Sequence, residues 1–151
     1  MKLSTKGRYG LRALVDIAEN CDLNPVSIQS ISERQNLSQT YLEQLLRLLR
    51  NAGLIKSQRG ANGGYVLAKP AEKISVGETI RALEGDLKAV VCTGENDSGC
   101  SQADLCATRF VWDRINDAIE KAVDGISIKE LVDKSKELRS SENLDTSACN
   151  N

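Results

Sequence analysis

The feature that most constrains the fold is a change of hydrophobic period at Gly53. Before this glycine, apolar residues over 39–52 recur at the three- and four-residue spacing of a helix. After it, residues 54–59 and 65–68 alternate between polar and apolar on either side of a glycine-rich segment, which is typical of a β-hairpin. The chain therefore places a hairpin directly after an amphipathic helix.

Residues 39–52 separate into two faces when they are placed about 100° apart around a helix axis. A polar face of this kind can be a solvated surface, with Glu43 and Arg47 paired across one turn. It can also be a surface that contacts another molecule. The apolar arc contains Leu42, Leu45, Leu46, Leu48, Leu49 and Ala52, with Tyr41 at its edge, and the polar arc contains Gln39, Thr40, Glu43, Gln44, Arg47 and Arg50.

Two further helical segments precede this helix. Residues 5–20 carry apolar residues at helical spacing, and Ser27 opens a short second helix. After a brief turn, Ser38 is suited to cap the N-terminus of the helix over 39–52. Two helices joined by three or four residues form a helix-turn-helix, and the hairpin that follows is the expected wing.

The tip of the hairpin, residues 60–64, is rich in glycine. Such a loop can cradle a phosphate, but this one joins two strands, and no Lys-Ser or Lys-Thr pair follows Gly64. Arg59, beside glycines that let the backbone approach a surface closely, suits insertion into the narrow minor groove of DNA. A plain surface hairpin is the alternative.

A long amphipathic helix is expected over about residues 103–123. A small winged domain offers little surface to cover it, so a second copy of the chain is the expected partner, and packing back on its own domain is the alternative. Before it, Ser75 begins a fourth helix that runs to about Glu84. After it, Ser127 begins one more short helix, and the polar segment that follows has little to bury. The predicted fold is mainly α with a small β wing, a winged helix-turn-helix plus a long dimerisation helix.

The predicted domains follow from these segments. They are a winged helix-turn-helix DNA-binding domain at 1–85, a cysteine-bearing cluster loop at 86–107, a dimerisation helix with a short following helix at 103–134, and a mobile tail at 135–151.

The net charge of −1 conceals a basic first part and an acidic second part. Residues 1–85 carry 12 Lys and Arg against 8 Asp and Glu, whereas residues 86–151 carry 8 against 13. A basic module of this kind fits binding to a polyanion. No apolar run approaches the roughly 20 residues of a membrane-spanning helix, and the N-terminus lacks the apolar core of a signal peptide, so we expect a cytoplasmic protein without a membrane partner.

Three of the five cysteines, Cys92, Cys100 and Cys106, lie in one segment with seven and then five residues between them. Thiolates are soft ligands for zinc, copper(I) or iron–sulfur clusters, and Gly94 and Gly99 let the backbone bend around a metal. Plain thiols are the alternative, because the spacing lacks the Cys-x-x-Cys pattern of common zinc sites. Histidine is absent, which excludes Ser-His and Cys-His catalysis, and we expect no enzyme.

Together these segments resemble the winged-helix transcription regulators of the IscR type, a family with nitric oxide-sensing and cysteine-metabolism branches. The resemblance covers nearly the whole chain. It implies a homodimer that binds double-stranded operator DNA and, in cluster-binding members, changes its DNA affinity or site preference with cluster occupancy. The resemblance rests on Met1–Tyr9, Leu37–Leu45, Gly53–Ile55, Arg59–Tyr65 and the three cysteines before Trp112.

By this resemblance, the polar arc of residues 39–50 would enter the major groove. Gln44 can bond an adenine edge, Glu43 can accept from cytosine, and the two arginines can hold phosphates. A carboxylate left without a donor repels phosphate, so Glu43 would also reject sites that lack a suitable cytosine. The DNA-binding residues that we expect are Arg8, Tyr9, Ser38, Gln39, Thr40, Tyr41, Glu43, Gln44, Arg47, Arg50, Arg59 and Gly60.

The resemblance also assigns an iron–sulfur cluster to Cys92, Cys100 and Cys106, but the chain departs from it at the fourth ligand. Regulators of the IscR type typically supply a histidine three residues after the last cysteine, where this chain has Arg109. We expect a labile cluster, with a two-iron two-sulfur centre preferred over a four-iron four-sulfur centre. The fourth ligand is open between a solvent molecule, a small thiol, a residue of the partner subunit, Asp104, Glu95 and Asp97.

Three functions are compatible with the sequence. The first is a transcription regulator that senses iron–sulfur status and controls genes for cluster biogenesis, with cluster-assembly or carrier proteins as further partners. The second is a thiol- or partner-controlled DNA-binding repressor without a cluster, as in the cysteine-metabolism branch. The third is a small metal-carrying or electron-transfer protein, against which the basic first part, the two-faced helix and the wing all argue.

Overall fold

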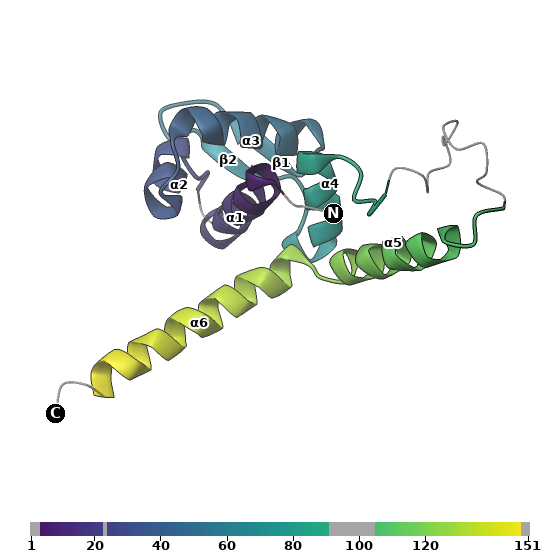
Figure 1. Cartoon of the computed structure of the whole chain (residues 1–151). Coiled ribbons are helices and arrows are strands. Elements are labelled where there is room, and N and C mark those ends of the chain that lie inside the picture. The colour runs from purple at the N-terminus through teal and green to yellow at the C-terminus, as the bar shows by residue number, and fades with distance from the viewer. Residues whose placement is uncertain (1–3, 23, 91–104, 149–151) are drawn as a thin grey trace.

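Three helices and a hairpin form the first part of the chain, in the order that the sequence predicts (Figure 1). The computed structural model describes residues 4–22, 24–90 and 105–148. A fourth helix follows the hairpin after one short 3₁₀ turn. The elements are α1 (Thr5–Asn20), α2 (Ile28–Gln35), α3 (Gln39–Asn51), β1 (Ile55–Gln58), β2 (Gly64–Leu67), the 3₁₀ turn η1 (Ala71–Lys73) and α4 (Val76–Glu84).

Serine residues cap the N-termini of α2, α3 and α4. The hydroxyl oxygens of Ser27, Ser38 and Ser75 each accept a hydrogen bond from the backbone N–H three residues on, at 3.1, 3.3 and 3.0 Å. Such a bond satisfies one of the backbone donors that a helix leaves free at its start. The starts of these helices therefore lie where the capping residues predict them.

The core lies between α1, α3 and α4 and consists almost entirely of aliphatic side chains. Leu42, Leu45, Leu46 and Leu49 of α3 are fully buried, as the apolar arc predicts, while Leu48 is half-buried and Ala52 is exposed just after the helix. The helices approach closely where α1 carries glycine. A Cβ atom at Gly10 would lie 2.5 Å from the methyl carbons of Leu83, so glycine allows Leu83 of α4 to pack directly on α1.

The wing is attached to the segment before α2. Val26 and Tyr65 exchange two backbone hydrogen bonds of 2.9 Å, which adds a short bridge to the antiparallel pair β1–β2. Gly64 lies at this crossing, where a Cβ atom would come within 2.6 Å of the carbonyl carbon of Val26. The close backbone approach fixes the position of the wing relative to the helix-turn-helix.

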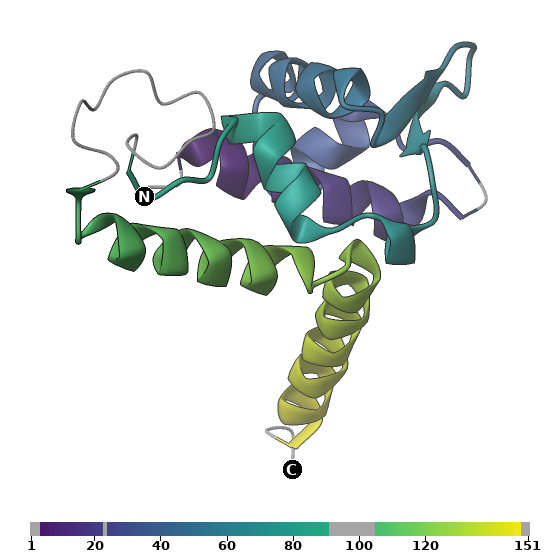
Figure 2. The same ribbon diagram turned by 90° about the vertical axis from the view of Figure 1, so that its right-hand side faces the viewer.

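Helices α5 (Arg109–Asp124) and α6 (Ile128–Ala148) extend from the winged-helix body. Helix α5 lies beside α4, and α6 points away from the body (Figures 1 and 2). The start of α6 belongs to the core, because Ile128 is fully buried and Val132 nearly so. No helix in the described ranges is both long and apolar enough to cross a membrane.

The apolar pattern predicts that this helix begins near residue 103, but α5 begins at Arg109. Residues 105–108 form a turn instead, in which the Cys106 carbonyl accepts a hydrogen bond of 3.1 Å from the Arg109 N–H. Residues 103 and 104 lie outside the described residues. The apolar stripe indicated the face of the helix but not its first turn, since no capping serine marks the start.

Helix α6 is longer than the short helix expected after Ser127, and it continues through most of the segment predicted to be a mobile tail. Polar side chains support it locally. Lys129 pairs with Asp133, and the hydroxyls of Ser140 and Ser141 donate to carbonyls four residues earlier at 2.9 and 3.1 Å. No glycine or proline interrupts residues 126–148. A lack of apolar residues limits tertiary packing but does not end a helix. Residues 149–151 of the predicted tail lie outside the described residues.

Candidate nucleic-acid interface

The polar arc of α3 lies on the surface. Its side chains are exposed, whereas the leucines on the other face are buried, so the helix presents polar groups in one direction. Both views place α3 on the side of the body away from α6 (Figures 1 and 2). Every predicted contact on this arc is therefore accessible, and Tyr41 is half-buried at its edge. The accessible residues are Ser38, Gln39, Thr40, Glu43, Gln44, Arg47 and Arg50.

Residues of α1 extend this surface. The rings of Tyr9 and Tyr41 meet edge to face, with centroids 6.3 Å apart, and the guanidinium groups of Arg8 and Arg12 lie 5.8 and 5.6 Å from the Tyr9 ring centroid. The Tyr41 hydroxyl also donates to Thr5 Oγ1 at 3.3 Å. The structure thus places Arg8 and Tyr9 beside the start of α3. Arg12 lies on the same surface, one turn after Arg8. It is not among the DNA-binding residues predicted from the sequence, in which its spacing from Arg8 is the only signal.

The other predicted contacts lie at the tip of the wing. Arg59 and Gly60 are exposed, and Gly60 has a φ of 124°, which side chains other than glycine rarely adopt. Gly63 donates from its N–H to the Gly60 carbonyl at 3.0 Å and closes the tip. The tip therefore carries one exposed cation on a backbone with little side-chain bulk, which suits a narrow groove.

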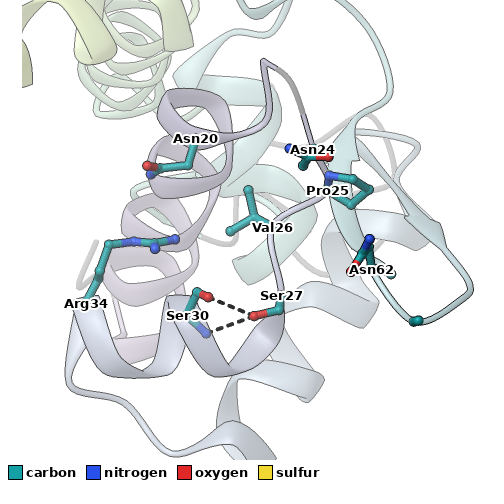
Figure 3. Close-up of a pocket in the computed structure, with 10 residues that line it drawn as sticks. Asn20, Asn24, Pro25, Val26, Ser27, Ser30, Arg34 and Asn62 are labelled. Carbon is teal, nitrogen blue, oxygen red and sulfur yellow. Dashed lines mark hydrogen bonds between the residues drawn. The ribbon is translucent and has the colours of Figure 1, made fainter.

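A polar hollow of about 580 Å³ lies between the wing tip and the start of α2 (Figure 3). Asn62 of the wing faces Asn24 and Ser27 across it. The hydroxyls of Ser27 and Ser30 lie 2.8 Å apart. Amides and hydroxyls of this kind are suited to water or phosphate oxygens rather than to an apolar ligand. These residues are not among those predicted from the sequence, in which the asparagines of the two loops are the available signal.

Glu84, the last residue of α4, holds the N-terminus of α1. Its Oε1 accepts hydrogen bonds from Ser4 N, Ser4 Oγ and Gly7 N at 2.9, 2.6 and 2.8 Å. Burial raises the pKa of Glu84, but the Ser4 hydroxyl and the N–H groups of Gly7 and Ser4 together outweigh it, so the net pKa is lowered. The position of Arg8 and Tyr9 thus depends on a residue that lies two positions before the predicted cysteine-bearing loop.

Replacing Glu84 by glutamine is expected to lower the free energy of unfolding by about 1 kcal/mol near neutral pH, because charge-assisted hydrogen bonds become neutral ones. Since the folded pKa lies below the unfolded one, this stabilisation is complete above the unfolded value of about 4.3 and is lost as pH falls through the folded pKa. Urea denaturation over that pH range would measure it. Glu72→Gln, at an exposed position, is the control. If the difference in free energy of unfolding between the wild type and Glu84→Gln did not change with pH, the stabilising role of the Glu84 carboxylate would be contradicted.

Cys106 is the member of the predicted cysteine set that the structure describes; Cys92 and Cys100 lie outside the described residues. Its thiol is exposed in the turn before α5, with Sγ 3.1 Å from Thr108 Oγ1. The hydrogen bond with the Thr108 hydroxyl, followed by the Arg109 backbone N–H, lowers the pKa of the Cys106 thiol. A thiol that ionises readily supplies the thiolate that binds iron, so this position fits the expected cluster.

Arg109 does not replace the missing histidine as a ligand. Its Nε lies 3.9 Å from Asp113 Oδ2, one turn along α5, and a guanidinium offers hydrogen-bond donors but no lone pair for a metal. Within the described part of the chain, no three His, Cys, Asp or Glu residues converge on a metal position. The other candidates for a fourth ligand, Asp104, Glu95 and Asp97, lie outside it.

Helix α5 has one covered face and one uncovered face. Ile119 and Val123 are partly buried and pack against the core, so part of the helix does pack back on its own domain. The adjacent face carries an exposed apolar stripe at helical spacing, with Val111 48% and Ile115 36% exposed. We call this face the α5 stripe; its members are Val111, Ile115, Ala118 and Ala122.

Comparison with known proteins gives consistent matches over most of the chain. The Rrf2 family, described as an iron-dependent transcriptional regulator, matches residues 3–134. The HTH-type transcriptional regulator IscR of Escherichia coli is 41% identical over 138 residues, which cover 91% of this chain and 84% of IscR.

Two solved structures match closely. CymR, the global cysteine regulator of B. subtilis, is 42% identical with a TM-score of 0.73, over 89% of this chain and 98% of CymR. IscR of T. potens is 42% identical with the same TM-score of 0.73, over 91% of this chain and 90% of that protein.

Proposed function

Because the chain belongs to the Rrf2 family of transcription regulators, we propose that it is a homodimeric regulator whose operator binding depends on an iron–sulfur cluster. DNA-binding transcription regulation is the activity that it shares with these relatives, and it is a regulator rather than an enzyme. The predicted winged-helix fold is confirmed by its structural neighbours. Beyond this shared activity, we propose that the protein binds a cluster, that it forms a dimer, and that the predicted residues contact DNA. We also propose that it acts in the cytoplasm, where the operator is found.

The exposed arc of α3 is the proposed element for the major groove. Gln44 and Glu43 would contact base edges, and Arg47 and Arg50 would hold phosphates on either side. The tip of the wing would place Arg59 in the adjacent minor groove. The separation of a buried leucine face from an exposed polar face on one helix supports this arrangement.

The α5 stripe is the proposed dimer interface. Apolar side chains that recur on one uncovered helix face are stabilised when a second copy of the same helix covers them. A two-fold dimer would also present two copies of α3 to successive turns of DNA, about 34 Å apart, as helix-turn-helix dimers require. The stripe lies beside the face that packs on the core, so both contacts can be made together.

The observation that carries the cluster proposal is the exposed Cys106 thiol, which lies in the turn before α5 and has a lowered pKa. Cys92, Cys100 and Cys106 would hold the cluster, which when bound supplies iron- and oxygen-sensitive chemistry. Because Arg109 cannot serve as the fourth ligand, the position is left to solvent, a small thiol or another carboxylate, which favours a labile cluster. Genes for cluster biogenesis are the proposed targets, and cluster-assembly or carrier proteins are proposed partners.

A thiol-controlled regulator is the second candidate. The similarity to the global cysteine regulator CymR favours it, and so does the exposed Cys106 thiol. A thiolate that forms readily is also the form that reacts with oxidants and disulfides. In this case the cysteines would act without iron.

We expect anaerobically purified protein to contain iron and acid-labile sulfide and to absorb visible light. Cys92→Ala, Cys100→Ala and Cys106→Ala should each abolish the iron and the absorption, because each variant replaces one of the three thiolate ligands by a methyl group, which cannot bind iron. Cys21→Ala is the matched control, since Cys21 is partly buried against the core and should leave the iron content unchanged. The ratio of iron to chain would distinguish two-iron from four-iron centres.

A colourless, iron-free protein after reconstitution would contradict the cluster proposal. The same result would support the thiol-controlled regulator if operator binding then changed with oxidation in the wild type but not in Cys106→Ala. Retention of iron by all three cysteine variants would place the metal elsewhere and would contradict the ligand assignment.

A further inference from the structure

An open cavity of about 260 Å³, which the proposed regulation does not use, lies between helices α1 and α6. Leu11, Val15 and Leu131 supply an apolar wall. Glu19 and Arg139 line the same cavity, one from each helix. Binding sites for small molecules typically combine an apolar wall with a few polar groups that orient the ligand, and a cavity of this size suits a small metabolite.

Glu19 is a buried carboxylate with one unsatisfied oxygen. Its side chain is only 7% exposed; Oε2 accepts from Arg139 Nη2, and Oε1 has no hydrogen-bond partner. Among the described residues it is the one buried side-chain nitrogen or oxygen atom left without a partner. A buried carboxylate oxygen without a donor destabilises the folded protein. Within this cavity it is therefore Glu19 Oε1 that lacks a hydrogen-bond donor.

Arg139 supplies the opposite chemistry at the same place. Its side chain is 63% exposed, and its Nη2 also donates to Ser135 Oγ at 2.9 Å, one turn earlier on α6. A guanidinium can bind a carboxylate through two parallel hydrogen bonds. Glu19 and Arg139 thus present an acceptor for an ammonium group and a donor pair for a carboxylate side by side, which is the arrangement that a zwitterion requires.

We propose that this cavity binds a free aliphatic α-amino acid. The ammonium group would donate to Glu19, the carboxylate would accept from Arg139, and the side chain would lie against Leu11, Val15 and Leu131. The ammonium group supplies the donor that Glu19 Oε1 lacks. This inference does not rest on the cluster, because none of these residues belongs to the cysteine-bearing segment.

The cavity lies next to contacts that position the DNA-binding elements. Asp16 in its wall accepts hydrogen bonds from Arg34, and from Gln35 Nε2 at 2.8 Å, at the end of α2. Arg12, also in the wall, donates to Gln35 Oε1 at 3.0 Å and lies against the Tyr9 ring. An amino acid bound here would act as an effector, since it would adjoin the contacts between α1 and the helix-turn-helix.

Isothermal titration of the full chain with L-leucine tests the proposal. We expect saturable binding, and binding at least about tenfold weaker for isocaproate, which lacks the ammonium group, and for isopentylamine, which lacks the carboxylate. Glu19→Gln and Arg139→Ala should each weaken leucine binding by at least about the same factor. Lys136→Ala, an exposed position of α6 outside the cavity, is the control and should bind leucine as the wild type does.

Thermal unfolding of each variant would show that it is folded before binding is compared. For Glu19, whose side chain is buried, Glu19→Asp provides a second variant that keeps the charge but withdraws it from the ligand. Absence of saturable binding of leucine, isoleucine, valine and methionine at about 10 mM would overturn the proposal. Unchanged affinity in either Arg139→Ala or both Glu19 variants would overturn it as well.

Discussion

Replacing Val111 and Ile115 together by glutamate is expected to convert the protein to a monomer and to weaken operator binding by at least about a hundredfold. Two half-sites that are bound by linked modules gain about 10² to 10⁴ in affinity over one module, and a monomer loses this gain. Four buried carboxylates at a two-fold interface without partners would prevent association. Because both side chains point away from the core, the fold of each subunit should be retained.

Light scattering would measure the mass in solution, and fluorescence anisotropy would measure affinity for an operator duplex selected with the wild-type protein. Lys121→Glu is the matched control, because it changes the net charge by the same two units at an exposed position of α5 outside the stripe. A double variant that remains a dimer would show that another surface holds the subunits together.

Replacing Arg47 and Arg50 together by alanine is expected to reduce operator affinity by about a hundredfold or more at low salt. Each phosphate contact contributes roughly 0.9 to the slope of log affinity against log salt, so four lost contacts in a dimer should reduce that slope by roughly 3 to 4. The loss should be similar for specific and unrelated duplexes, since phosphates carry no sequence information. Both side chains are exposed and alanine favours helices, so stability should change little.

Anisotropy titrations at several salt concentrations would measure the slope. Lys129→Ala with Lys134→Ala is the matched control, because it removes the same charge from α6, which lies away from α3 (Figure 1). An unchanged slope in the arginine variant would mean that these side chains do not contact phosphate. A loss confined to the specific duplex would instead assign them to base edges.

The elements of the winged domain were predictable because their signals are local. Ser27, Ser38 and Ser75 marked helix starts through bonds to residues three positions away. The exposure of the α3 arc was predictable for the same reason, since the helical period alone separates Arg47 and Arg50 from the leucines. The DNA contacts of these residues remain predictions.

The two C-terminal helices show where the same signals are insufficient. The first turn of α5 lacks a side-chain cap, so its apolar stripe could not locate Arg109 as the start. The polar segment after residue 134 was predicted to be mobile because it has little to bury. Residues 135–148 of this segment are helical, because helix formation also depends on neighbouring polar pairs and on the absence of glycine and proline.

The sequence by itself determined the order of the helices, the hairpin, the face of each helix that is apolar, and the basic character of the first domain. The tertiary structure decided which distant residues meet. Glu84 bonds to Gly7, 77 positions away, and Arg139 pairs with Glu19, 120 positions away. Periodicity reports only which direction a side chain takes from its own helix. Its partner depends on how the helices pack, and that packing is set by close approaches such as the contact of Gly10 with Leu83.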